Sequence, residues 1–200
     1  MKYKQKYHFH ILLWIYGTIL LLISFISCKP DYTPKPDAYY RIEIPAPEYQ
    51  IADIDLPVSF ETSVYTQIIQ DSIHKNSNWF NILYPAYKAT LYCSFEKVRN
   101  KKELIKILQE NKELVYRHTV RADAIEAKEY EAPDSKLFAT LYHLTGNSAT
   151  PLQFVVTDSS NYMLRGALYF DNQVKNDSVA PVVDYITQDV VHLIESINKN

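Results

Sequence analysis

Apolar and polar residues are distributed along this chain in three distinct patterns. A mainly apolar run with no charged residue extends from Ile11 to Ile26. After residue 38, some segments alternate apolar and polar positions with a period of two, and others repeat apolar residues every three or four positions. The first pattern indicates a membrane-directed segment, and the other two indicate strands and helices of a folded domain.

The period-two segments predict strands, because successive side chains of a strand point to opposite faces. A first strand is expected at Tyr39–Ile44, ending at Pro45, and a second places Val58, Phe60 and Val64 on one side together with Thr62. Further strands are predicted over WFNILYP and ATLYCSF, paired around the turn at Pro85–Lys88, over KLFATLYHL, and over QFVVTD and YMLRGALYF, joined as a hairpin by SSN.

Two segments have helical spacing of their apolar residues. The first starts near Asn100 or Lys101 and ends before Tyr130, with apolar positions at Leu104, Ile107, Leu108, Leu114 and Val115. The second has Asp177 or Ser178 as its N-cap and Pro181 in its first turn. Its apolar stripe comprises Val182, Val183, Ile186, Val190, Leu193, Ile194 and Ile197. Asp184, Gln188, Asp189 and Glu195 flank this stripe.

The order of these elements is strands, one helix, strands and one helix, without a βαβ repeat. It predicts an α+β fold: a mainly antiparallel β-sheet with two packed α-helices, one central and one C-terminal. We expect a single globular α+β domain over residues 39–200.

Residues 1–27 have the layout of a lipoprotein signal peptide that is cleaved from the mature protein. Lys2, Lys4 and Lys6 precede the apolar run, whose 16 residues would span roughly 24 Å as a helix, less than the ~30 Å core of a bilayer. Ser27 precedes Cys28, whose thiol is the expected site of lipidation, with palmitate-type chains. Phe25 stands at a position where Leu is commonest in lipoprotein signals. The alternative to a cleaved signal peptide is a retained signal anchor with an incidental cysteine.

Residues 28–38 are expected to form a lipidated cysteine and a proline-rich tether. Pro30, Pro34 and Pro36 disfavour both a helix and a central strand. At ~3.1 Å per residue, such a tether would hold the domain roughly 30 Å from the membrane. The lipid chains would provide the membrane attachment.

The composition of the mature chain narrows the classes of function. Without the three leader lysines, 18 basic residues remain against 23 acidic ones, a formal charge of −5. This charge argues against nucleic acid as a partner. Cys93, the only other thiol, lies among strand formers and is interpreted as a buried, inert residue rather than a nucleophile. Three glycines and 17 tyrosines indicate few tight glycine turns and an aromatic surface suited to interfaces.

The sequence contains no recognisable catalytic set, and neither a cofactor nor a metal is expected. His74, His118, His143 and His192 lack the spacing of zinc ligands. Gly146 and Asn147 lie in TGNSAT, a candidate functional loop that a strand connection explains equally well. Asp123 and Glu126, near the end of the first helix, could bind a cation or pair with Arg121; the second reading is favoured.

Five segments, in order, carry a family resemblance: CKPDYTPKPDAYYRIEIP, WFNILYPAYKATLY, HTVRADAIE, TGNSATPLQFVVTDSSNYMLRGALYF and SVAPVVDYITQDVVHLIESI. Together they resemble the gliding-motility lipoprotein GldD family across nearly the whole mature chain. The resemblance implies an accessory protein of surface gliding and of the type 9 secretion system. It implies no reaction, and the one site residue that it carries over is Cys28.

Two hypotheses of different classes follow. The first is a non-enzymatic lipoprotein, anchored to a membrane of the cell envelope with its domain in the periplasm. It would dock onto other envelope lipoproteins and membrane proteins of the gliding and secretion machinery. The second is a small envelope enzyme or a glycan-binding module that uses its aromatic surface and the loop at Asn147. A contiguous exposed Tyr/Phe patch without a deep pocket favours the first hypothesis, and an acidic pair at one cleft favours an enzyme.

Overall fold

The computed structural model describes residues 14–18, 42–70, 78–117, 122–132, 136–172 and 176–199. By its internal contacts the chain divides into two units, Met1–Ala38 and Tyr39–Asn200. In the first unit, residues 14–18 are helical. Ser27, Cys28 and the proline-rich segment lie outside the described residues, so the cleaved leader and the tether remain predictions. No helix within the described residues is long and apolar enough to cross a membrane.

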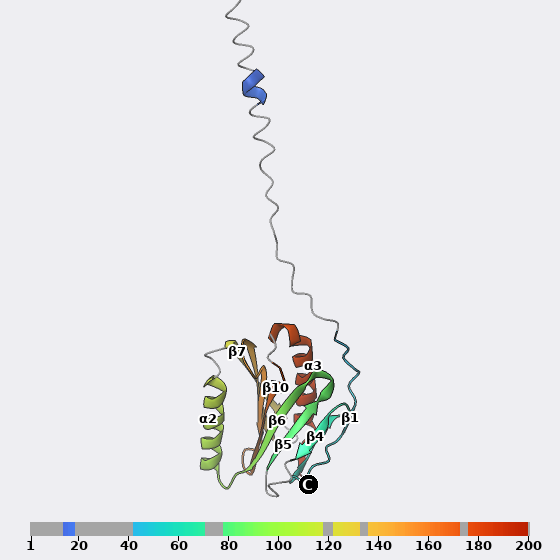
Figure 1. Cartoon of the computed structure of the whole chain (residues 1–200). Coiled ribbons are helices and arrows are strands. Elements are labelled where there is room, and N and C mark those ends of the chain that lie inside the picture. The colour runs from blue at the N-terminus through green and yellow to red at the C-terminus, as the bar shows by residue number, and fades with distance from the viewer. Residues whose placement is uncertain are drawn as a thin grey trace, which may run out of the picture. The chain divides into compact units, whose positions relative to one another are not determined.

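The second unit is built on a seven-stranded antiparallel sheet with the strand order β4-β5-β6-β10-β9-β8-β7 (Figure 1). Its strands are β4 (Gln67–Gln70), β5 (Trp79–Tyr84), β6 (Ala89–Lys97), β7 (Ala122–Ala132), β8 (Leu137–Gly146), β9 (Leu152–Thr157) and β10 (Tyr162–Phe170). Two small antiparallel pairs accompany it: β1 (Tyr49–Ile51) with β3 (Glu61–Ser63), and β2 (Val58–Ser59) with β11 (Asn198–Lys199).

Two long helices lie on opposite faces of the seven-stranded sheet, α2 (Lys101–Arg117) on one side and α3 (Asn176–Glu195) on the other (Figure 1). A short 3₁₀ helix, η1 (Pro85–Tyr87), connects β5 to β6. The predicted α+β fold, with a mainly antiparallel sheet and a central and a C-terminal helix, is therefore confirmed.

Turn conformation stabilises the first predicted hairpin connection, and short polar side chains stabilise the second. Between β5 and β6, Pro85 begins η1 and Lys88 ends it with a φ of 50°. Between β9 and β10, the Thr157 hydroxyl donates to the carbonyl of Tyr162 at 2.6 Å, and Oδ1 of Asp158 accepts the backbone N–H of Asn161 at 2.7 Å. These local bonds set the register of β9 against β10.

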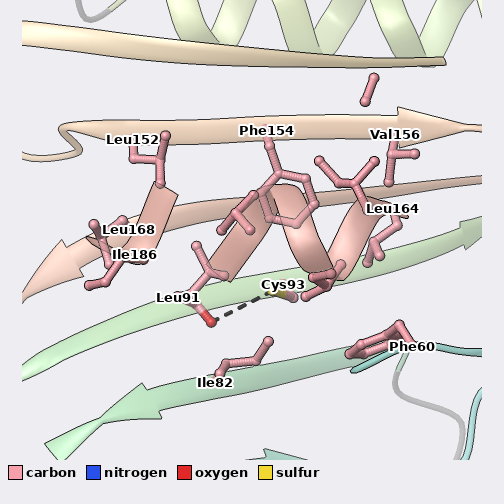
Figure 2. Packing of buried hydrophobic residues seen from close by; sticks show 14 of the residues in the cluster. Phe60, Ile82, Leu91, Cys93, Leu152, Phe154, Val156, Leu164, Leu168 and Ile186 are labelled. Atoms are coloured by element: carbon pink, nitrogen blue, oxygen red, sulfur yellow. Dashed lines mark hydrogen bonds between the residues drawn. The ribbon is translucent and has the colours of Figure 1, made fainter. Parts of the chain in front are cut away.

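The larger hydrophobic core lies between the sheet and α3 (Figure 2). Every residue of the predicted C-terminal stripe is buried in this core, and Ile186 is completely inaccessible to solvent. Cys93 is also buried there, as predicted, with its thiol 3.7 Å from the carbonyl oxygen of Leu91. A smaller cluster under α2 contains Val98, Leu104, Val115, Tyr142, Leu144, Val155 and Met163.

Several local predictions differ from the structure. The strand predicted over residues 58–65 is divided into β2 and β3, which pair with different partners. Residues 42–48 have no regular structure, and the first strand is β1; Pro45 and Pro47 cannot donate to a strand ladder. Helix α2 ends at Arg117, within the predicted limit, but residues 122–132 form the strand β7, so Asp123 and Glu126 lie in a strand and not at the end of a helix. Helix α3 begins at Asn176, so Pro181 lies inside the helix rather than in its first turn, which removes one backbone hydrogen bond.

Candidate functional site

The most unusual polar group of the domain is the carboxylate of Asp189 on α3. The sequence pattern placed it on the solvent-facing flank of the helix, yet only 4% of this residue is exposed. Its oxygen Oδ2 has no hydrogen-bond partner within the part of the chain that the structure describes. A buried, incompletely satisfied carboxylate is costly, and in native proteins it calls for an explanation.

Tyrosines from four elements surround this carboxylate. We call Tyr49 of β1, Tyr84 of β5, Tyr87 of η1 and Tyr185 of α3 the tyrosine cluster. The hydroxyl of Tyr49 donates to Oδ1 of Asp189 at 3.2 Å, and Tyr84 acts as a further donor to the same carboxylate. The ring of Tyr87 meets that of Tyr185 edge-on, with centroids 5.7 Å apart. The hydroxyl oxygens of Tyr185 and Ser63 are 3.4 Å apart.

His192, one turn after Asp189 on α3, completes the arrangement. Its ring stacks on Tyr49 with centroids 3.6 Å apart and an angle of 10° between the planes. Its Nε2 lies 2.7 Å from Oε2 of Glu61 in β3, a contact that is an ion pair when the imidazole is protonated. Four contacts therefore fasten the small β1-β3 pair to α3 through side chains.

Burial decides the protonation behaviour of this site. Loss of solvation raises the pKa of Asp189 from its ordinary value of 3.8 to about 6, although the hydrogen bonds from Tyr49 and Tyr84 and the charge of His192 act in the opposite direction. Burial and the neighbouring carboxylate raise the pKa of Tyr49 to about 12. The same causes, burial first, raise the pKa of Tyr84 well above its usual value.

A hollow of about 660 Å³ opens beside the tyrosine cluster. Its lining residues are Ile42, Glu43, Ile44, Pro45, Tyr65, Tyr84, Ala86 and Tyr87. Tyr84 thus belongs both to the wall of the hollow and to the surroundings of Asp189. The hydroxyl of Tyr87 donates to the carbonyl oxygen of Glu43 at 3.1 Å, which ties the irregular segment 42–48 to η1.

The described residues support neither a thiol nucleophile nor a metal centre. Cys93 is a poor nucleophile, because complete burial raises the pKa of its thiol far above the ordinary value. Within the described ranges, no group of three or more His, Cys, Asp or Glu residues is placed to hold a metal ion.

Of the predicted loop residues, Gly146 and Asp123 lie next to each other in the structure, whereas Asn147 lies in the adjoining connection. Gly146, with a φ of 84°, ends β8, and a Cβ at this position would clash with the side chain of Asp123. Asp123 lies at the irregularity in β7 between Ala122, which is the cross-strand partner of this glycine, and Ala124. Asn147 is exposed in the connection to β9, which hydrogen bonds between Ser148 and Thr150 stabilise. The loop is well explained as a strand connection, and its role in binding remains a prediction.

A second surface feature is the half of the sheet that α2 leaves uncovered. Ile69 of β4, Asn81 of β5 and Tyr92 of β6 are direct cross-strand partners. Trp79 and Tyr169 point to the same face as Tyr92, and the rings of Tyr92 and Tyr169 meet edge-on at 5.5 Å. We call Ile69, Trp79, Tyr92 and Tyr169 the open-face patch; 67% of Trp79 and 51% of Tyr92 are exposed.

Sequence reasoning missed both the buried carboxylate and its partners, although one signal for the carboxylate was present. Asp189 lies three residues after Ile186 and four before Leu193, so it falls within the apolar stripe of α3. No comparable signal links Tyr49 to Asp189, because these two residues are 140 positions apart.

Comparison with known proteins identifies the family. No curated protein matches the chain. The solution structure of cyanobacterial PsbP (CyanoP) from Synechocystis sp. PCC 6803 is similar with a TM-score of 0.44 and 9% identity, covering 82% of this chain and 98% of that chain. This similarity is too distant to bear on function. The family model described as gliding motility lipoprotein GldD matches residues 29–198. The chain therefore belongs to the GldD family of gliding motility lipoproteins, a family of the cell envelope.

Proposed function

We propose that this lipoprotein is a non-enzymatic accessory component of the gliding and type 9 secretion machinery and acts by protein–protein docking. The observation that carries the docking role is the open-face patch. An exposed aromatic and aliphatic surface on one side of a sheet is typical of sites that bind other proteins. The partners would be other lipoproteins and membrane proteins of the envelope.

The patch has the composition of an interaction site. Trp and Tyr contribute a large contact area with few rotatable bonds, which is why they are enriched where interfaces have their energetic centre. Trp79 of β5 is a diagonal neighbour of Tyr92 of β6. Tyr169 of β10 contacts the ring of Tyr92 from the neighbouring strand on the other side. A partner that covers this face would bury all three rings together.

The membrane attachment in this proposal depends on Cys28, with the leader removed before it and the domain facing the periplasm. Cys28→Ala should abolish lipidation and leave the leader uncut or the protein in the wrong compartment. Mass spectrometry of the mature protein provides the measurement, and an unmodified Cys28 in the wild type would refute the anchor.

Crosslinking and pull-down from native envelopes test the docking role. The double variant Trp79→Ala/Tyr92→Ala should fold normally and lose a specific envelope partner that the wild type retains. The control variant Ile105→Ala/Tyr116→Ala removes similar exposed side chains from α2, on another part of the surface. If both double variants retain the same partners as the wild type, the open-face patch is not the docking site.

The hollow beside the tyrosine cluster favours one second candidate, a glycan-binding role. Tyrosine rings can stack on sugar rings, and Tyr65 and Tyr87 both line the hollow. Soluble peptidoglycan fragments serve as the probe. Binding that is lost in Tyr65→Ala and unaffected by Trp79→Ala would favour this candidate over docking.

A further inference from the structure

The small β1-β3 pair is held to the rest of the domain mainly through one face of α3. β1 is only three residues long and pairs with β3 alone. Two backbone hydrogen bonds flank it, from Val64 N–H to the Glu48 carbonyl at 3.0 Å and from Ala52 N–H to the Phe60 carbonyl at 2.9 Å. Ile51, the last residue of β1, is 73% exposed, so this strand buries little apolar surface of its own. Its attachment to α3 depends on Tyr49.

Two side-chain contacts of Tyr49 are with α3. Its ring stacks on His192 and its hydroxyl donates to Asp189. Separation of the segment around Tyr49 from α3 would remove one of the four tyrosines that surround Asp189 and would let water approach its carboxylate. The closed and open arrangements therefore differ in whether this carboxylate is buried.

We propose that Asp189 is a proton-operated latch: the protonated carboxyl group holds the segment 48–51 closed on α3, and ionisation of this group favours release of the segment. The free oxygen Oδ2 supplies the physical reason. An ionised carboxylate that lacks a partner for one oxygen gains solvation when the segment opens, whereas a neutral carboxyl group gains much less. The hydrogen bond from Tyr49 favours the ionised form, but burial outweighs it.

The direction of the pH dependence follows from linkage. The pKa of Asp189 is about 6 when the latch is closed and close to 3.8 when the carboxylate is in water. The closed form binds the proton more tightly, so raising the pH through this interval shifts the equilibrium toward the open form. Full exposure of the group on opening would increase the open fraction roughly tenfold between pH 5 and pH 8.

Other titratable groups also face Asp189, and their contributions to the pH dependence must be separated from that of Asp189. Tyr49 of β1, Tyr84 of β5, Tyr87 of η1 and Tyr185 of α3 all have pKa values raised by burial, and their hydroxyls stay neutral over this range. Within the described part of the chain, His192 is the charged side chain that acts on Asp189, and His192 in turn contacts Glu61. Imidazoles titrate between pH 5 and 8 in general, so a His192→Gln variant is needed to separate the two contributions.

Hydrogen exchange of the full chain in lipid nanodiscs, read by mass spectrometry, tests the latch. Exchange of the peptide that covers residues 48–52, corrected for the chemical pH dependence of amide exchange, should accelerate roughly tenfold from pH 5 to pH 8 in the wild type. Asp189→Asn should remove this acceleration and protect the segment at pH 8. Asp184→Asn, the same change at an exposed position of α3, should behave as the wild type does.

The proposal is overturned if Asp189→Asn and the wild type show the same pH dependence, or if His192→Gln alone abolishes it. A second measurement uses the wild-type protein alone, so it does not depend on whether the Asp189→Asn variant folds. In the wild type, selectively ¹³C-labelled aspartate and tyrosine should show one common transition near pH 6, in the Asp189 carboxyl signal and in the Tyr49 ring signal. A Tyr49 signal without a transition between pH 5 and pH 8 would refute the coupling.

Discussion

The hydroxyl of Tyr49 donates a hydrogen bond to Asp189, which follows it by 140 positions, and the same tyrosine ring stacks on His192 one turn further along α3. A residue near the beginning of the folded domain is thereby joined to its last helix. The contact lies beside the hollow that Tyr84 and Tyr87 line. The stability of this region, the protonation of Asp189 and the shape of the adjacent hollow are therefore coupled.

Tyr49→Phe is expected to destabilise the domain more at pH 8 than at pH 5. The phenyl ring preserves the stacking on His192 but removes the donor to Asp189. Since this donor lowers the pKa of Asp189, its loss moves that pKa further above about 6, and more stability is lost as the pH rises. A cost of roughly 1–3 kcal/mol is expected at pH 8.

Urea unfolding at the two pH values measures this difference. Tyr65→Phe is the matched control, because Tyr65 is half exposed. It should change stability little at either pH. An equal loss for Tyr49→Phe at pH 5 and pH 8 would show that its hydrogen bond does not depend on the charge of Asp189.

Ile186→Ala and Ile194→Ala should each cost roughly 2–5 kcal/mol, because truncation of a buried aliphatic side chain loses its transfer energy and leaves a cavity. Both side chains lie in the core under α3. Thermal unfolding of the purified protein provides the measurement, with the exposed Gln188→Ala as control. Unchanged melting in both isoleucine variants would contradict the core assignment of α3.

Gly166→Ala should destabilise the centre of the sheet. The ring of Phe154, on the neighbouring strand β9, lies across Gly166, and an added Cβ would clash with this ring. Overpacking of this kind costs roughly 1–3 kcal/mol. Phe154→Leu removes the ring, so the double variant should lose less stability than the sum of the two single variants. Strict additivity would mean that the clash is relieved elsewhere.

Cys93→Ala should reduce stability only moderately, by roughly 0.5–3 kcal/mol, and leave function intact. Its thiol is buried in the core, and burial raises its pKa far above the usual range. In the folded protein, alkylation of Cys93 should therefore be slow, and should accelerate under denaturing conditions. Rapid alkylation of the native protein accompanied by loss of function would contradict this assignment.

The elements with strong periodicity could be predicted from the sequence. The stripe of α3 and the paired strands β5-β6 and β9-β10 have apolar residues at the positions that face the core, and turn residues at their connections. The edge strand β7 could not be predicted in this way. It pairs with β8 alone, and most of its side chains are exposed, so no alternation of apolar and polar residues marks it.

The candidate site was less predictable than the fold for a physical reason. Tyrosine and histidine are common at partly exposed positions, so their presence in a sequence does not reveal which of them meet. The contact of Tyr49 with α3 depends on how the β1-β3 pair lies on that helix, which is decided by tertiary packing. Asp189 is a partial exception: its spacing from Ile186 and Leu193 places it on the same helix face as the apolar stripe, although its charge favoured a position on the flank.

The unequal hydrophobic clusters on the two faces of the sheet have a consequence for partial unfolding. Helix α2 contributes two buried apolar side chains, Leu104 and Val115, to the smaller cluster, whereas α3 is part of the large core. Helix α2 should therefore detach as a separate low-energy unit while the opposite layer stays intact. Its departure would uncover Tyr142, Leu144 and Val155, and the exposed apolar surface would then reach from β4 across to β8.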